Sequence, residues 1–192
     1  MRKLYQQALS RVRRFKADKG GATAIEFAFL AIPFFTLLFG ILELAIIFFL
    51  SSTLSHAVGE AGRLIRVGSF QNCGQAAFKT AVCSRMNAIG NCQNNLRIDV
   101  VSGPTFNVIN LIDPPVPPQA QPGQPAPPIP NGQFTPTIAG DPVVVRALFY
   151  HKLLLPPQLT RLENIPGSGT RVVTSTTAFR NEPFPTQACA SP

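Results

Sequence analysis

The chain has 192 residues and a formal net charge of +8, with 14% charged and 45% hydrophobic residues. An intrinsically disordered chain would be richer in charge and poorer in apolar side chains, so that class is excluded. The charge is concentrated in residues 1–21, which contain seven cations and one anion. Residues 22–192 are close to neutral, with ten cations and eight anions.

The segment 27–50 predicts a membrane-spanning helix, because Glu43 is the only charged side chain among its 24 residues. At a rise of about 1.5 Å per residue the helix is about 36 Å long, enough to cross a hydrocarbon core of about 30 Å with some tilt. A signal peptide is the alternative. The apolar cores of signal peptides are about 7–15 residues long and seldom carry a glutamate, which favours the membrane span.

The basic segment 1–21 predicts the orientation of this helix. Cations are enriched on the cytoplasmic side of membrane helices, and the flank after the span carries few of them. We therefore expect a cytoplasmic leader at 1–21 and residues 51–192 on the opposite side. The same cations could bind nucleic acid, but their position directly before an apolar span argues against a nucleic-acid partner.

Residues 51–67 continue the helical pattern beyond the membrane. The sequence predicts one helix from about Ala22 to Val67, stopped by Gly68, whose second half projects outward as a stalk. A break near Ser51 is the alternative. The positions that share one apolar face are Leu54, Val58, Ala61 and Ile65.

Residues 69–192 predict a small α+β domain. A helix is expected over 71–89, and the alternation of apolar and polar residues predicts antiparallel strands at 96–101, 143–150 and 171–179. Residues 113–130 contain nine prolines in 18 positions, so a disordered Pro-rich loop is expected over 113–136. A solvated spacer is one interpretation of this loop, and a docking segment for a partner is the other.

The four cysteines are expected to form disulfides, because all lie on the predicted non-cytoplasmic side. We favour Cys83–Cys92 and Cys73–Cys189 among three connectivities that the sequence leaves open. Their spacing is unlike that of zinc ligands, so no metal is expected. Neither His56 nor His151 lies near a nucleophile motif, and no cofactor fingerprint is present, so the sequence does not predict an enzyme.

The junction between leader and helix reads Gly21-Ala22-Thr23-Ala24-Ile25-Glu26-Phe27. It resembles the class III signal that prepilin peptidases cleave, here after Gly21. With Glu43, the stretch 59–63 and the segment 177–184, it resembles the TadE-type minor pseudopilins of the tight-adherence (Flp) pilus. The resemblance implies a bacterial inner-membrane protein with a periplasmic domain, whose partners are lipid, a prepilin peptidase and other pilin subunits. An uncleaved single-pass anchor that presents an interaction domain is the alternative.

Two carboxylates in the apolar segment have candidate roles. Cleavage after Gly21 would create an α-amine on Ala22, four residues before Glu26, so the two charges could pair within one molecule or between neighbours. Glu43 lies near the outer end of the span. Its side chain either reaches toward the headgroups or contacts a partner subunit, and the sequence leaves both open.

Overall fold

The computed structural model describes residues 21–70, 73–86, 91–118 and 127–185. The chain divides into two compact units, the first ending at Leu42 and the second beginning at Glu43. Of the basic leader predicted for 1–21, only Gly21 lies within the described residues. Within the described part the fold is mixed α+β, as predicted.

The first element is α2, a single helix of 45 residues from Ala22 to Arg66. It continues through Ser51, where a break was the alternative to a single helix. The helix is terminated by a turn at Gly68, which has a φ of 82° and donates its N–H to the carbonyl of Ile65 at 3.0 Å. The N–H of Ser69 reaches the carbonyl of Leu64 at 2.9 Å, so the helix closes with a Schellman motif that needs a glycine at this position.

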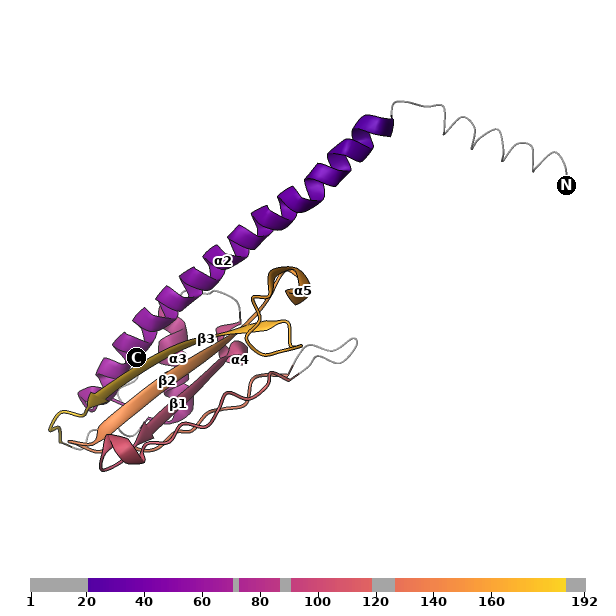
Figure 1. The fold of residues 1–192 in the computed structure, drawn as a ribbon. Coiled ribbons are helices and arrows are strands. Elements are labelled where there is room, and N and C mark those ends of the chain that lie inside the picture. The colour runs from indigo at the N-terminus through magenta and orange to yellow at the C-terminus, as the bar shows by residue number, and fades with distance from the viewer. Residues whose placement is uncertain (1–20, 71–72, 87–90, 119–126, 186–192) are drawn as a thin grey trace, which may run out of the picture. The chain divides into compact units, whose positions relative to one another are not determined.

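Three antiparallel strands form one sheet in the order β1-β2-β3 (Figure 1). Their bounds are Leu96–Ser102 for β1, Pro142–Lys152 for β2 and Thr170–Arg180 for β3. All three predicted strands are confirmed, each with slightly wider bounds. These strands are rich in β-branched residues, which pack well on a pleated surface. The alternation of apolar and polar residues therefore predicted the strands correctly.

Short helices complete the unit that begins at Glu43. They are α3 (Gln75–Arg85), α4 (Cys92–Asn95), the 3₁₀ helix Phe106–Val108 and α5 (Pro157–Thr160). The helix predicted over 71–89 is present as α3, and residues 71–72 and 87–90 lie outside the described part.

The main core lies between one face of the sheet and the helices α2 and α3. It contains residues from all three strands together with the C-terminal half of α2. The fully buried large side chains of this core include Leu50, Leu54, Val58, Phe78, Ile98 and Val100.

The second half of α2 does not project as a stalk. Leu54, Ala57, Val58 and Ala61 are fully buried in the core that α2 shares with the sheet. The apolar face predicted for 51–67 is real, but the strands cover it within the same chain. The compact unit consequently begins at Glu43 and not at residue 69.

The Pro-rich segment is partly held by main-chain pairing. Phe134 forms a parallel bridge with Val100, and Gln133 and Thr135 exchange hydrogen bonds of 2.8 Å with the Val100 main chain. Residues 127–136 are therefore fixed along the free edge of β1, in contrast to the disorder expected for 113–136. The edge strand supplies unpaired N–H and C=O groups that an extended segment can satisfy. Residues 119–126 lie outside the described part.

Gly132 explains how this segment approaches so closely. A Cβ atom at this position would lie 2.1 Å from the carbonyl oxygen of Ile98 in β1. The side chain of Gln75 in α3 donates to the carbonyl oxygens of both residues, at 2.9 Å to Ile98 and 3.0 Å to Gly132. Only glycine permits this three-way contact between the loop, β1 and α3.

Candidate functional site

The predicted processing junction lies at the exposed beginning of α2. The helix starts at Ala22, directly after Gly21, and a Cβ atom added to Gly21 would meet nothing within 4 Å. Glu26 is exposed, and Phe27 is 69% exposed. Both motif side chains are thus available for contacts with another molecule.

The apolar part of α2 presents large hydrophobic side chains to its surroundings. The helix has a mean hydropathy of 2.4 over its most apolar 18-residue window, of which 11% is buried. A core helix of a soluble protein would bury such residues, whereas here they remain uncovered along the helix. Its length, composition and exposure support a single-pass membrane anchor. The large exposed side chains include Ile25, Phe29, Leu30, Ile32, Phe34, Leu37, Phe39, Ile41, Phe48 and Phe49.

Glu43, the carboxylate near the outer end of the predicted span, is bound by its own chain. Its side chain is fully buried and accepts hydrogen bonds from the backbone N–H of Leu154 at 2.5 Å and of Leu155 at 3.3 Å. A buried carboxylate requires donors of this kind, because burial without them is costly. The contact differs from both roles considered from the sequence, a carboxylate that reaches the headgroups and one that contacts a partner subunit.

His151 lies close to this buried carboxylate at the end of β2. Burial lowers the pKa of the His151 imidazole, and the negative charge of Glu43 partly offsets the shift. Its Nε2 atom is buried and has no hydrogen-bond partner among the described residues. The imidazole is thereby biased toward its neutral form.

Two sequence motifs that lie far apart in the chain meet in the structure. A Cβ atom on Gly62 of α2 would lie 3.1 Å from the ring of Phe179 and 3.2 Å from the methyl group of Thr177. One turn later the Arg66 guanidinium lies 6.0 Å from the centre of the Phe179 ring. Glycine at position 62 therefore lets α2 pack directly against β3, so the two motifs form one helix–sheet contact.

The contact continues past the ends of both elements. The backbone N–H of Glu182 donates to the carbonyl of Arg66 at 3.0 Å, and their side chains form an ion pair at 3.9 Å. The ring of Phe184 lies against Gly68, where a Cβ atom would approach it to 2.5 Å. The C-terminal segment thus holds the end of α2 in place.

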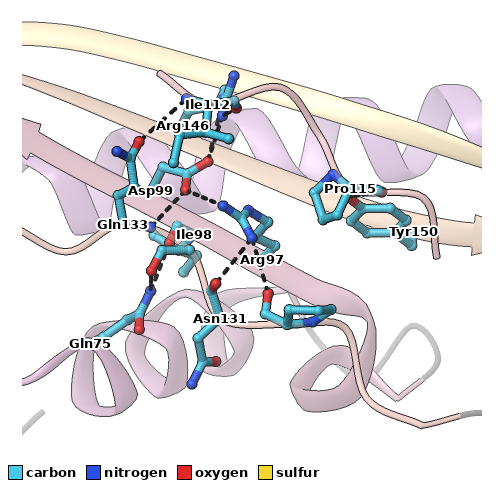
Figure 2. A network of polar contacts seen from close by, with 12 residues as sticks. Gln75, Arg97, Ile98, Asp99, Ile112, Pro115, Asn131, Gln133, Arg146 and Tyr150 are labelled. Atoms are coloured by element: carbon cyan, nitrogen blue, oxygen red, sulfur yellow. Dashed lines mark hydrogen bonds and ion pairs between the residues drawn. The ribbon is translucent and has the colours of Figure 1, made fainter. Parts of the chain in front are cut away.

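A polar network occupies the opposite face of the sheet, around the fully buried Asp99 of β1 (Figure 2). Arg97 donates to Oδ1 of Asp99 at 3.1 Å, and the backbone N–H of Gln133 donates to the same oxygen at 2.8 Å. Arg146 of β2 donates to Oδ2 through Nε at 3.1 Å and through Nη2 at 2.7 Å. The carboxylate therefore has four donors and pairs with two guanidinium groups.

The two arginines also attach the Pro-rich segment to the sheet. Arg97 donates to the carbonyl of Asn131 at 3.0 Å, and Arg146 donates to the carbonyl of Ile112. Beside them the Tyr150 hydroxyl donates to the carbonyl of Pro115 at 3.0 Å (Figure 2). The network therefore joins β1 to β2 and joins both strands to the loop, which gives it a structural role.

Residues 21–63 match the model of the TadE-like protein family. This chain carries a TadE-like segment. The match includes Gly21, Glu26, Glu43 and the stretch 59–63, and it confirms the resemblance over these residues. No curated protein and no solved structure matches the chain.

Outside the TadE-like segment, one of the two predicted disulfides, Cys83–Cys92, is confirmed. Cys83 and Cys92 are joined, with their Cα atoms 5.7 Å apart, and the bond links the end of α3 to the start of α4. Cys73 is 4% exposed. The expected partner of Cys73, Cys189, lies outside the described residues, so this second pairing stays a prediction.

Metal ligands were not expected. Among the described residues, no three His, Cys, Asp or Glu side chains are grouped so that they could hold a metal ion.

The Asp99 network and the partners of Glu43 were not predicted from the sequence. A signal for the first was present, since Arg97 and Asp99 point to the same face of β1 and carry opposite charges. No such signal existed for the second, because a backbone N–H can come from any residue except proline.

Proposed function

We propose that this chain is a minor pseudopilin-type protein of the tight-adherence pilus, held in the bacterial inner membrane with its α+β unit in the periplasm. The match of residues 21–63 to the TadE-like family carries the proposal. The exposed apolar helix that holds this segment supports the membrane anchor. The α+β unit contains a disulfide and a polar network in which the Asp99 carboxylate has four donors from the same chain. Both features support a structural and non-catalytic role.

Processing by a prepilin peptidase after Gly21 is part of the proposal. Gly21 has no side chain beside the bond to be cut, and space is open around it. Cleavage would make Ala22 the first residue of the mature chain, at the first position of α2. A peptidase would thus remove the basic leader and leave the helix intact.

Glu26 then acquires a partner. Residues four apart on a helix are neighbours, with Cβ atoms about 5–6 Å apart, so the new α-amine of Ala22 can reach the Glu26 carboxylate. The pair would stabilise two opposite charges near the membrane surface, either within one molecule or between adjacent helices. We propose that Glu26 acts in assembly, after the cut.

The partners follow from the surface of α2. Its large exposed apolar side chains suit lipid and the apolar helices of other pilin subunits, and the peptidase is a transient partner. Nucleic acid is not a proposed partner.

The test compares single substitutions in cells that contain a prepilin peptidase. Gly21→Val should abolish the lighter mature form, and Gly40→Val should leave it unchanged. Gly40 is a suitable control because it lies within α2, away from the predicted cleavage site, and like Gly21 has open space around its Cβ position. Glu26→Gln should be cleaved normally but should co-purify with fewer pilin subunits.

Two results would contradict the proposal. If the wild-type chain keeps its leader when the peptidase is present, the protein is an uncleaved anchor. If Glu26→Gln blocks cleavage, Glu26 is a recognition element for the peptidase and the charge-pair account is wrong.

A further inference from the structure

We propose that the turn of the β2–β3 hairpin inserts into the headgroup region of the membrane that α2 spans. The turn follows Lys152 and contains α5, which lies at the end of the hairpin (Figure 1). Two large apolar side chains in the turn are uncovered, since Leu154 is 74% and Leu159 is 62% exposed. Both leucines belong to the same short turn, and uncovered apolar surface of this kind can mark contact with a membrane.

Glu43 sets the level of this turn along α2. The backbone N–H groups of Leu154 and Leu155 both donate to its carboxylate, so the turn lies beside Glu43. Beyond Glu43 the helix still exposes large aromatic residues, with Phe48 at 78% and Phe49 at 57%. At about 1.5 Å per residue, these two residues lie about 8–9 Å farther along the helix than Glu43. The turn is therefore on the membrane side of the last exposed apolar residues of the span.

The main chain of the turn is suited to a medium with little water. The N–H of Leu153 donates to the carbonyl of Gly169 at 3.0 Å, and the next two N–H groups are taken by Glu43. Pro156 and Pro157 follow, and proline has no N–H to satisfy. Five consecutive positions thus present no unsatisfied N–H, and backbone N–H groups inside a bilayer must be satisfied in this way.

The charges around the turn favour lipid over another protein as its occupant. Lys152 and Arg161 flank the leucines and are exposed, and the sequence between them contains no Asp or Glu. Long cationic side chains reach lipid phosphates while their neighbours lie deeper. The nearest carboxylate in the sequence, Glu163, accepts hydrogen bonds from the N–H groups of Gly167 at 3.2 Å and Gly169 at 3.0 Å. The surface is therefore apolar with a cationic border.

The inference goes beyond the proposed function and rests on one part of it, the crossing of the bilayer by α2. A cleaved and an uncleaved chain would both place the turn at the same level. Its consequence is that the α+β unit contacts the membrane at the hairpin as well as through α2.

Tryptophan fluorescence tests the proposal directly, since the chain contains no Trp. The full chain with Leu154→Trp is reconstituted into vesicles of phosphatidylethanolamine and phosphatidylglycerol, with or without bromine on the acyl chains. The matched control is Phe106→Trp. Phe106 is 50% exposed and follows the end of β1 that pairs with Val143. Val143 and Lys152 are nine residue steps apart along β2, which places Phe106 about 30 Å from the turn at about 3.3 Å per residue.

We expect Leu154→Trp to emit at shorter wavelength than Phe106→Trp and to lose much of its fluorescence to the brominated lipid. Leu159→Trp should behave in the same way, and it decides the question if Leu154→Trp lowers the melting temperature. Quenching by aqueous acrylamide to the level of Phe106→Trp would show a turn in water. Protection from both acrylamide and brominated lipid would show a turn covered by protein. Either result would overturn the proposal.

Discussion

The carboxylate of Glu43 accepts a hydrogen bond of 2.5 Å from the backbone N–H of Leu154, although 111 residues separate the two in the sequence. The contact joins the apolar helix α2 to the far end of the β2–β3 hairpin. It explains how a glutamate can lie within an apolar segment, because its charge is met by main-chain donors that the sheet leaves unpaired.

Substitution of Glu43 is expected to loosen the hairpin. Glu43→Gln keeps one oxygen as an acceptor but removes the charge, so we expect a loss of about 1–3 kcal/mol in the free energy of unfolding. Glu43→Leu should cost more, because it leaves two N–H groups without an acceptor. Denaturant unfolding in detergent micelles measures both values.

The matched control is Glu60→Gln in the same helix. Glu60 forms an ion pair with Arg85 at 3.1 Å, its carboxylate lies 3.8 Å from Nε2 of His56, and its side chain is 53% exposed. Exposed pairs contribute about 0–1 kcal/mol, so this variant should unfold almost as the wild type does. Equal effects of Glu43→Gln and Glu60→Gln would contradict the structural role assigned to Glu43.

Asp99 is expected to be the most sensitive polar residue of the sheet. Asp99→Asn leaves Arg97 and Arg146 without their counter-charge, and breaking a buried pair in this way costs about 3–5 kcal/mol. The exposed Asp113 provides the control, since Asp113→Asn removes the same charge from a solvated position. Chemical denaturation measures both, and a similar midpoint for the two variants would exclude the network as a source of stability.

Removal of the disulfide should lower stability by a moderate amount. The bond closes a loop with a sequence separation of 9, and a loop of this size corresponds to about 2–3 kcal/mol. We expect the double variant Cys83→Ser, Cys92→Ser to melt at a lower temperature than the wild type. Alkylation of unreduced wild-type protein should label neither residue, and labelling of both would contradict the bond.

His151 is expected to make stability depend on pH. Burial lowers the pKa of His151 in the folded state, so the unfolded chain binds a proton more readily as the pH falls. Stability should therefore be full above about pH 6.5, the usual histidine value, and should decline as the pH drops below it.

His151→Phe removes this titration. The free energy of unfolding of this variant should therefore depend less on pH between about pH 7 and pH 5, the range in which histidine titrates. His56→Gln is the control, because the side chain of His56 is 73% exposed. Unfolding midpoints measured across this range decide the question. A wild-type profile that stays parallel to that of His151→Phe would show that His151 does not contribute.

The helices and strands were largely predictable, and their partners were not. The spacing of Leu54, Val58 and Ala61 correctly indicated one apolar face of α2. Periodicity does not say what covers such a face, so the sequence could not distinguish a projecting stalk from a helix packed on its own sheet. The role of Gly62 could not be predicted from the sequence. Its lack of a side chain matters because Phe179 and Thr177 approach it in the folded chain.

The contacts of the Pro-rich segment were hidden for a similar reason. Prolines exclude a helix and a central strand, which made disorder the natural expectation for 113–136. The segment is held by the edge of β1 and by arginine side chains that donate to its carbonyl groups, and carbonyl groups have no sequence signature.

Processing after Gly21 is tested most directly by the N-terminal sequence of the wild-type protein, purified from the membranes of cells that contain a prepilin peptidase. We expect a mature chain that begins at Ala22, so that its first residues read Ala-Thr-Ala-Ile-Glu-Phe. A chain that still begins at Met1 would contradict processing and leave the protein as an uncleaved membrane anchor.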